Sequence, residues 1–471
     1  MRLPFVLVCY TAFAFGGDAA QPPKVFRAGA ATSNVTPWLG VSINGGFHDH
    51  KAAHVHDELH ARCIVLDDSE TRLAIVVVDS CMVPREIFDQ AKRVASERTG
   101  IPASNMLMSA THTHSAPAAT PVFQSDPDPE YQKFLARRIA DGVMRAANNL
   151  APAKIAWGSA QVPDQVFNRR WFMKSGLELR DPFNRTNDRV KMNPPVGSTD
   201  LVEPAGPTDP EVVFISLQHT NGKPLALLAN YSLHYCGGVG QGIISADYFG
   251  MFADRVQELL GADRQDPPFV AAMANGTSGN INNINFRGGQ PKQPLFSQMR
   301  LVGHRVAQAV HEAHGKIEFK DWAPLKALQT EITLGVRKPA QADVQRADAL
   351  MSATAFVLSS PQEIYARETV LIKDYPDEVA LLLQTLRIGN VGIAAVPCEV
   401  FVEIGLDLKK NSPWKPSFTI SLGNGYNGYL PTVEHFELGG YETWGARSSY
   451  LETNAAPKIY DAVLGLLKKL E

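Results

Sequence analysis

Two histidines separated by one residue stand where an apolar run ends. The run from 105 to 110 leads into Thr111-His112-Thr113-His114, so both imidazoles follow a stretch that predicts a strand. In a strand, positions i and i+2 point to the same side, and both rings would then face one cleft. Neutral imidazole is the commonest metal ligand among side chains, so the pair indicates a metal site. A pair of hydrogen-bonded surface histidines is the alternative that this spacing leaves open.

Two further positions offer the ligands that a catalytic zinc uses. His234 follows the apolar run 225–230, and Glu399 follows the run 391–396. Two histidines, a carboxylate and an open coordination position are a common set in catalytic zinc sites. Each residue also has an ordinary alternative role. His234 would be a buried, hydrogen-bonded histidine, and Glu399 would cap the helix expected from Val400.

Other polar residues are candidates for the surroundings of such a site. Asp79 and Asp247 are interpreted as carboxylates that orient the ligand histidines, with helix capping as the alternative for Asp247. Tyr426 and Tyr429 lie in a Gly/Asn-rich loop, where ordinary loop packing is the alternative. We interpret most of the N-terminal histidines as structural or rim residues: His48, His50, His54, His56 and His60.

Strands and helices that must position these residues alternate along the chain. Apolar runs predict strands buried on both faces at 73–79, 225–230, 269–273 and 391–396. Helical faces are expected around 87–95 and 248–259, and near 129–149, 296–314, 340–358, 376–386, 400–411 and 456–470. This order predicts an α/β fold in which mixed, buried β-sheets are flanked by helices. The proline-rich stretch 168–210 is interpreted as a long functional loop over one domain rather than a linker.

Composition and the N-terminus bear on location. The 471-residue chain is 45% hydrophobic and 20% charged with a net charge of −3, which predicts no nucleic-acid partner and no anionic membrane surface. Residues 1–20 combine Arg2, an apolar run and small residues, the layout of a secretory signal peptide. An N-terminal strand or anchor is the alternative. We therefore expect a secreted or periplasmic protein without a transmembrane segment. Buried thiols are expected, with one disulfide as the alternative, at Cys63, Cys81, Cys236 and Cys398.

Taken in order, these segments resemble the neutral (non-lysosomal) ceramidase family. The most specific match is Ser109–Pro117, around the histidine pair. Weaker matches follow in the family's order at 29–37, 56–62, 77–80, 168–170, 209–212, 230–234, 396–399 and 426–434. The resemblance implies one ceramidase-like catalytic domain over residues 21–471. It also implies a zinc ion held by His112, His234, Glu399 and Tyr429.

The chain departs from the family at two places. The family's functional serine is matched by Asn282, whose amide can donate to an oxyanion but cannot serve as the usual hydroxyl nucleophile. The C-terminal β-sandwich of ceramidases is expected to be absent, because the chain reaches Glu471 after one last predicted helix.

These residues suggest hydrolysis by a zinc-bound water, which needs no serine. His114 would contact substrate or protonate the leaving group, and Asn282 or Tyr429 would steady the oxyanion. Arg169 and Arg170 would bind a polar part of the substrate, with salt bridges on a long loop as the alternative. We therefore predict a secreted zinc-dependent amidohydrolase of lipid metabolism that cleaves a ceramide-like N-acyl amide. The alternatives are a zinc hydrolase of another amide, an ester or a carbohydrate derivative, and a non-catalytic binding protein.

Overall fold

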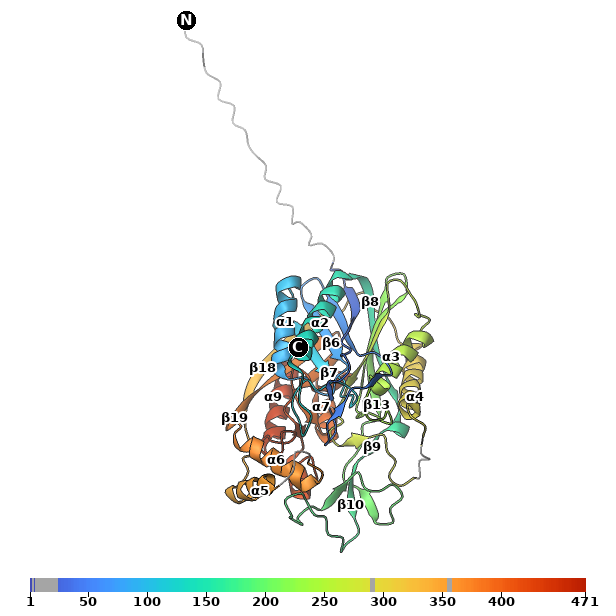
Figure 1. The fold of residues 1–471 in the computed structure, drawn as a ribbon. Helices are drawn as coiled ribbons and strands as arrows, with labels where there is room; N and C mark the ends of the chain where they lie inside the picture. The colour runs from blue at the N-terminus through green and yellow to red at the C-terminus, as the bar shows by residue number, and fades with distance from the viewer. Residues whose placement is uncertain (2–3, 5–23, 289–292, 354–357) are drawn as a thin grey trace.

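Two β-sheets pack face to face at the centre of the structure (Figure 1). The computed structural model describes Met1, Pro4 and residues 24–288, 293–353 and 358–471, so the predicted signal peptide lies almost wholly outside the described residues. The strands of the larger sheet are β1 (Arg27–Asn34), β5 (His60–Asp67), β6 (Arg72–Val78), β7 (Met106–Ala110), β8 (Ala151–Gln161), β13 (Glu211–His219), β14 (Pro224–Tyr231) and β16 (Val270–Asn275). The smaller sheet consists of β18 (Leu325–Gly335), β19 (Glu378–Ile388), β20 (Val391–Val396) and β22 (Ser417–Ser421).

Successive residues of a strand point to opposite faces of its sheet, and here apolar residues point to both faces. Helices therefore cover the outer face of each sheet. The longer helices are α1 (Arg85–Thr99), α2 (Pro129–Asn148), α3 (Asp247–Leu259), α4 (Ser297–His314), α5 (Gln341–Ala353), α6 (Pro361–Lys373), α7 (Val402–Asn411) and α9 (Ala455–Lys469). Helices α1 and α2 pack on one half of the larger sheet, α3 and α4 on the other half, and α7 and α9 on the smaller sheet (Figure 1). The resulting helix–sheet–sheet–helix layering confirms the predicted α/β fold with helix-flanked mixed sheets.

The two edges of the larger sheet come together. Its strand order is β16-β14-β13-β8-β1-β5-β6-β7, yet β16 contacts β6 and β7, and β22 of the smaller sheet contacts both edges. The pairs β6/β7, β14/β16 and β20/β22 are parallel. Ligands commonly bind where the carboxyl ends of such strands meet, so this junction is where polar loops converge.

The remaining elements are short. They are β2 (Ser42–Ile43), β3 (His50–Lys51), β4 (His54–Val55), β9 (Phe167–Asn168), β10 (Arg170–Met173), β11 (Val190–Met192), β12 (Leu201–Pro204), β15 (Ile243–Ile244), β17 (Ile281–Asn282), β21 (Glu399–Val400), β23 (Tyr429–Leu430) and α8 (Val433–Leu438). The predicted loop at 168–210 therefore contains a three-stranded sheet, β11-β10-β12.

One predicted helix was wrong, because residues 376–386 lie mostly in β19. Leu381 and Leu383 face the core under α7 and α9, whereas Leu386 and Ile388 face the larger sheet. Pairing with β18 and β20 thus overrides the helix preference of a leucine-rich run. Helix α6 was not predicted, although its capping box, formed by Ser360 and Glu363, was a readable signal.

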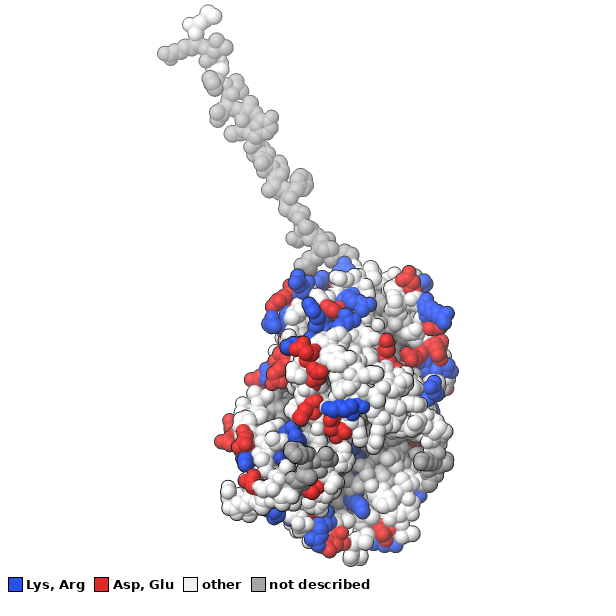
Figure 2. Space-filling model, in the orientation of Figure 1, with Lys and Arg blue, Asp and Glu red and all other residues white. Residues whose placement is uncertain are grey.

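The distribution of surface charge relates to the prediction on partners, and the length and hydropathy of the helices relate to the prediction on membrane spans. Figure 2 shows basic and acidic side chains interspersed over the visible face. Among the described residues, no helix combines the length and the apolar character needed to cross a membrane.

Candidate metal centre

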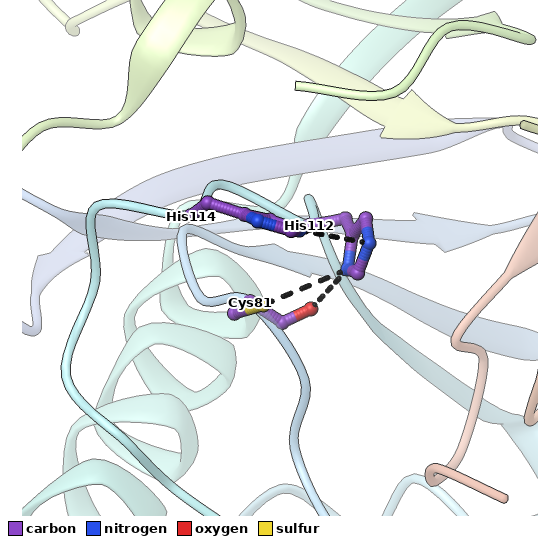
Figure 3. Close-up of side chains that lie close together, drawn as sticks. All are labelled: Cys81, His112 and His114. Carbon is purple, nitrogen blue, oxygen red and sulfur yellow. Dashed lines mark hydrogen bonds between the residues drawn. The ribbon is translucent and has the colours of Figure 1, made fainter. Parts of the chain in front are cut away.

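His112 enters the site through a turn rather than as part of a strand. Strand β7 ends at Ala110, and His112 has a φ of 75°, in the left-handed region. Its backbone N–H donates to the carbonyl of Ser80 (2.8 Å), and its Nδ1 lies 2.7 Å from the carbonyl of Cys81. Figure 3 shows the ring between Cys81 on one side and His114 on the other. The two imidazoles share one cleft as predicted, but strand alternation is not the reason.

His234 approaches from the other half of the larger sheet, after β14, the strand next to the edge strand β16. Its Nδ1 lies 3.0 Å from the carbonyl of Ser278. Because a carbonyl only accepts, the Nδ1 atoms of His112 and His234 are both donors, and each Nε2 carries a lone pair in the neutral ring. These two Nε2 atoms lie 3.0 Å apart. Two lone pairs therefore point at one place.

Glu399 is contributed by the smaller sheet's side of the junction. It lies in β21, directly opposite Tyr429 in the parallel pair β21/β23. Its Oε2 is 3.2 Å from His112 Nε2 and 3.9 Å from His234 Nε2. That oxygen is buried and has no hydrogen-bond partner among the described residues. Its Oε1 accepts a hydrogen bond from the hydroxyl of Tyr426 (3.3 Å).

A cation fits this donor set. The ligating atoms of His112, His234 and Glu399 all lie within 4.8 Å of one another. Zinc–nitrogen bonds of about 2.0–2.1 Å place tetrahedral ligand atoms roughly 3.3 Å apart, close to the separations seen here. A second group, Cys81, His112 and His114, meets the same distance limit. However, Cys81 lies on the Nδ1 side of His112, where the carbonyl of Cys81 already takes the proton.

Electrostatics at the cluster agree with this interpretation. Burial opposes a charge on His112, but Glu399 and Cys81 together raise the pKa of His112 well above its ordinary value. Burial, Arg169 and His112 lower the pKa of His234 well below its ordinary value. A neutral His234 is suited to coordination, and a cation would take the place of the proton that Glu399 attracts to His112.

A cavity of about 350 Å³ opens onto the cluster. His114 lines it, with Nε2 3.2 Å from His112 Nε2 and its ring stacked on Tyr235 at 3.7 Å. Asn282 also lines it, and its amide donates to Asn193 Oδ1 (2.8 Å). Of the residues predicted from the sequence, the structure thus brings His114 and Asn282 to the same cavity as the three potential ligands.

Tyr429, expected as the fourth ligand, lines the cavity but has other hydrogen-bond partners. Its hydroxyl lies 3.2 Å from Arg169 Nη2 and 3.3 Å from the hydroxyl of Tyr441. Burial and Glu399 raise the pKa of Tyr429 well above its ordinary value, so the phenol is neutral without a cation beside it.

The two arginines differ in position. Arg169 lines the cavity and also donates to the carbonyl of Gly279 (2.6 Å). Arg170 is fully buried and does not line the cavity. Glu442 binds both, through Oε1 to Arg169 (3.2 Å) and Oε2 to Arg170 (2.9 Å). The geometry of Arg170 matches the salt-bridge alternative rather than substrate contact.

The two aspartates do not contact the ligand histidines, which corrects that prediction. Asp79 pairs with Arg62 (2.5 Å) and accepts from the backbone N–H of His60. Asp247 begins α3 and accepts from the N–H groups of Cys236 and Gly237, just after His234. Backbone carbonyls orient the histidines instead.

The remaining sequence candidates lie outside the cluster. The four described cysteines are free. Cys63, Cys81 and Cys398 are buried as expected, whereas Cys236 is only partly buried. None of the five N-terminal histidines belongs to a potential metal-binding group among the described residues. His56, for example, pairs with Asp57 and stacks on Phe296.

Comparison with known proteins identifies the family. The profile described as "Neutral/alkaline non-lysosomal ceramidase, N-terminal" matches residues 26–293. The chain belongs to this ceramidase family. The neutral ceramidase of Pseudomonas aeruginosa is 23% identical over 417 residues, covering 77% of this chain and 59% of the relative. The chain thus spans less than two thirds of that relative's length.

Solved ceramidase structures share the fold. A crystal structure of the P. aeruginosa neutral ceramidase aligns with a TM-score of 0.72 at 18% identity, covering 95% of this chain and 75% of that one. A second structure, of a ceramidase complexed with C2, gives the same values.

Several residues that shape the site were not predicted from the sequence. The carbonyls of Cys81 and Ser278 orient the ligand histidines, but every residue type has a carbonyl, so no sequence signal marks them. Tyr235 and Tyr441 complete the cavity wall. Glu442 follows Tyr441 in the segment Gly439-Gly440-Tyr441-Glu442, and its isolated charge was the one readable signal.

Proposed function

We propose that this protein is a zinc-dependent hydrolase of an N-acyl amide bond of the kind found in ceramides. The observation that carries the proposal is the convergence of His112 Nε2, His234 Nε2 and the unpartnered Oε2 of Glu399 at one end of a cavity. Family membership supports the reaction class, and the apolar run within residues 1–20 supports export.

The ion would be held by His112, His234 and Glu399, with the hydroxyl of Tyr429 as the proposed fourth ligand. When bound, zinc supplies a Lewis acid that polarises a carbonyl and lowers the pKa of a bound water to about 7. Tyr426 donates to Glu399 Oε1 and so leaves Oε2 directed at the histidines. Arg169 would hold the Tyr429 hydroxyl in place.

The other cavity residues would serve the substrate. His114 Nε2 faces the cavity beside His112, where it can take a proton from the attacking water and then pass it to the leaving nitrogen. Burial, His112 and Arg169 lower the pKa of His114 well below its ordinary value, so the ring rests neutral. Asn282 donates one amide hydrogen to Asn193, which leaves the second for an oxyanion.

The first test is the metal content of the purified protein by elemental mass spectrometry. We expect about one zinc per chain, with loss of the metal in His112→Ala and in His234→Ala. His54→Ala is the matched control, because His54 is an exposed histidine outside the cluster. The same preparations are then assayed for hydrolysis of an N-acylsphingosine, a simple ester and a glycoside.

Equal metal content in the parent and both ligand variants would refute the site. Stoichiometric zinc without turnover of any amide would refute the reaction class and favour a binding protein on this fold. Turnover of amides that disappears together with zinc is the result expected from the proposal.

A further inference from the structure

The cavity is lined by two chemically different groups of side chains, called its two walls below. The first adjoins His112, since the carbonyl that orients this ring belongs to Cys81 and the next residue, Met82, lines the cavity. Val122 and Phe123 pack beside Met82, and Phe47 lies against Phe123 with ring centroids 4.8 Å apart. This wall is apolar.

The second wall adjoins His234, and most of its polar groups are carboxamides. Arg169 also lines the cavity there, but Glu442 already pairs with its guanidinium. Ser278 orients His234, and the chain continues from it to Asn282 and Asn283, which both line the cavity. Asn193 joins them from the loop after β11, where a φ of 43° and a bond from its N–H to the Arg169 carbonyl fix its backbone. These three asparagines are called the amide wall below.

Asn283 shows that the amide wall has unused hydrogen-bonding capacity. Its side chain is only 3% exposed, yet it makes no hydrogen bond within the described part of the chain. Asn283 lines the cavity, and its amide keeps a small accessible surface there. Buried amides are normally hydrogen-bonded, which points to a ligand as the missing partner.

The chemistry of the amide wall defines that partner. A carboxamide both donates and accepts hydrogen bonds and carries no charge. Hydroxyl groups do the same, so three neighbouring carboxamides match a neutral group with several hydroxyls. An anion would be attracted by the amide hydrogens but repelled by the amide oxygens. A cation would be attracted by the oxygens but repelled by the hydrogens.

The cavity size limits the rest of the substrate. Its volume of about 350 Å³ lies near the lower end of the range for small-molecule sites, roughly 300–1,000 Å³. It accommodates a ring or short polyol together with the scissile amide and a short acyl group.

We propose that the substrate is a short-chain N-acyl derivative of an amino-polyol or amino sugar. The amine part lies on the amide wall through its hydroxyls, and the acyl chain lies on the apolar wall. Water adds across the amide: the C–N bond breaks, a C–O bond forms, and the nitrogen takes up the proton as carboxylic acid and amine separate. This inference rests on the proposed amide hydrolase function and names its substrate class.

The test compares kcat/KM for an N-acetyl amino sugar with that for an N-acetyl alkylamine lacking hydroxyls. The parent should prefer the amino sugar. Asn283→Leu, which keeps the branched shape and the number of side-chain heavy atoms but removes both hydrogen-bonding atoms, should lower this selectivity ratio at least tenfold while zinc content stays near one per chain. Asn148→Leu, at an exposed position of α2, is the control and should keep the parent's ratio. Asn193→Ala provides the same comparison at an exposed position if Asn283→Leu does not fold.

The possible results separate the two proposals. An unchanged selectivity ratio in both variants, or faster hydrolysis of long-chain N-acylsphingosines than of amino sugar derivatives, overturns the substrate class and leaves the amide hydrolase proposal standing. Absence of both zinc and amide turnover overturns both proposals. A reduced ratio with zinc retained supports both.

Discussion

Replacing Glu442 by alanine should destabilise the protein more than any single change on its surface. Glu442 is fully buried, and its two oxygens bind Arg169 (3.2 Å) and Arg170 (2.9 Å), which are also buried. Removing one partner of a buried ion pair leaves uncompensated charge, at about 3–5 kcal/mol. Here two guanidinium groups lose the same carboxylate, so we expect a value at the upper end of that range.

The thermal shift follows from the chain length. Unfolding entropy of about 2.1 cal/mol/K per residue gives roughly 1 kcal/mol/K for this 471-residue chain. Glu442→Ala should therefore lower the Tm by about 5 °C and shift the urea midpoint in the same direction. Calorimetry and urea unfolding of the zinc-loaded protein measure both quantities.

Glu437→Ala is the matched control, because Glu437 is an exposed glutamate of the same segment. It should change the unfolding free energy by no more than about 0.5 kcal/mol. If Glu442→Ala is equally mild, the buried charges are compensated by something other than Glu442, and the reasoning about Arg169 and Arg170 is wrong.

Two further predictions concern the site and the pH dependence of stability. Gly45→Ala should reduce amide hydrolysis at least tenfold without loss of zinc, because Gly45 has a φ of 110° and a Cβ there would overlap the His114 ring. Turnover and metal content are measured on the same preparation, and unchanged turnover would contradict the prediction. Burial lowers the pKa of Lys92 to about 8, against 10.5 for an ordinary lysine. Between those values the unfolded chain binds more protons, so the unfolding free energy should rise with pH by up to ~1.4 kcal/mol per unit. Urea unfolding at pH 8 and pH 10 measures this rise relative to Lys92→Met, and parallel curves would contradict it.

The sequence predicted the potential ligands well because they are polar residues at the ends of apolar strands. His112, His234 and Glu399 each follow such a strand, and their side-chain types are those that zinc binds. The same logic failed for Asp79 and Asp247. A carboxylate near a strand end has many possible partners, and only the fold decides that Asp79 meets Arg62.

The fold class was predictable from alternating strands and helices, whereas one element and the sheet closure were not. The sequence of strand β19 predicts a helix because leucine favours helices, and pairing with β18 and β20 overrides that preference. No local sequence pattern predicts that the two edge strands of the eight-stranded sheet, β16 and β7, come into contact. That closure depends on the twist accumulated over the whole sheet.

Because the two edges of the larger sheet come together, the potential ligands of the candidate metal centre come from distant parts of the chain. His112 follows the edge strand β7, and His234 follows β14 beside the other edge strand β16, so the two histidines come from opposite ends of the strand order. Glu399 is supplied from the other sheet, after β20. A cation held by all three would connect both edges and both sheets at one point. Because such a complete donor set forms only in the folded chain, binding energy there adds directly to folding stability.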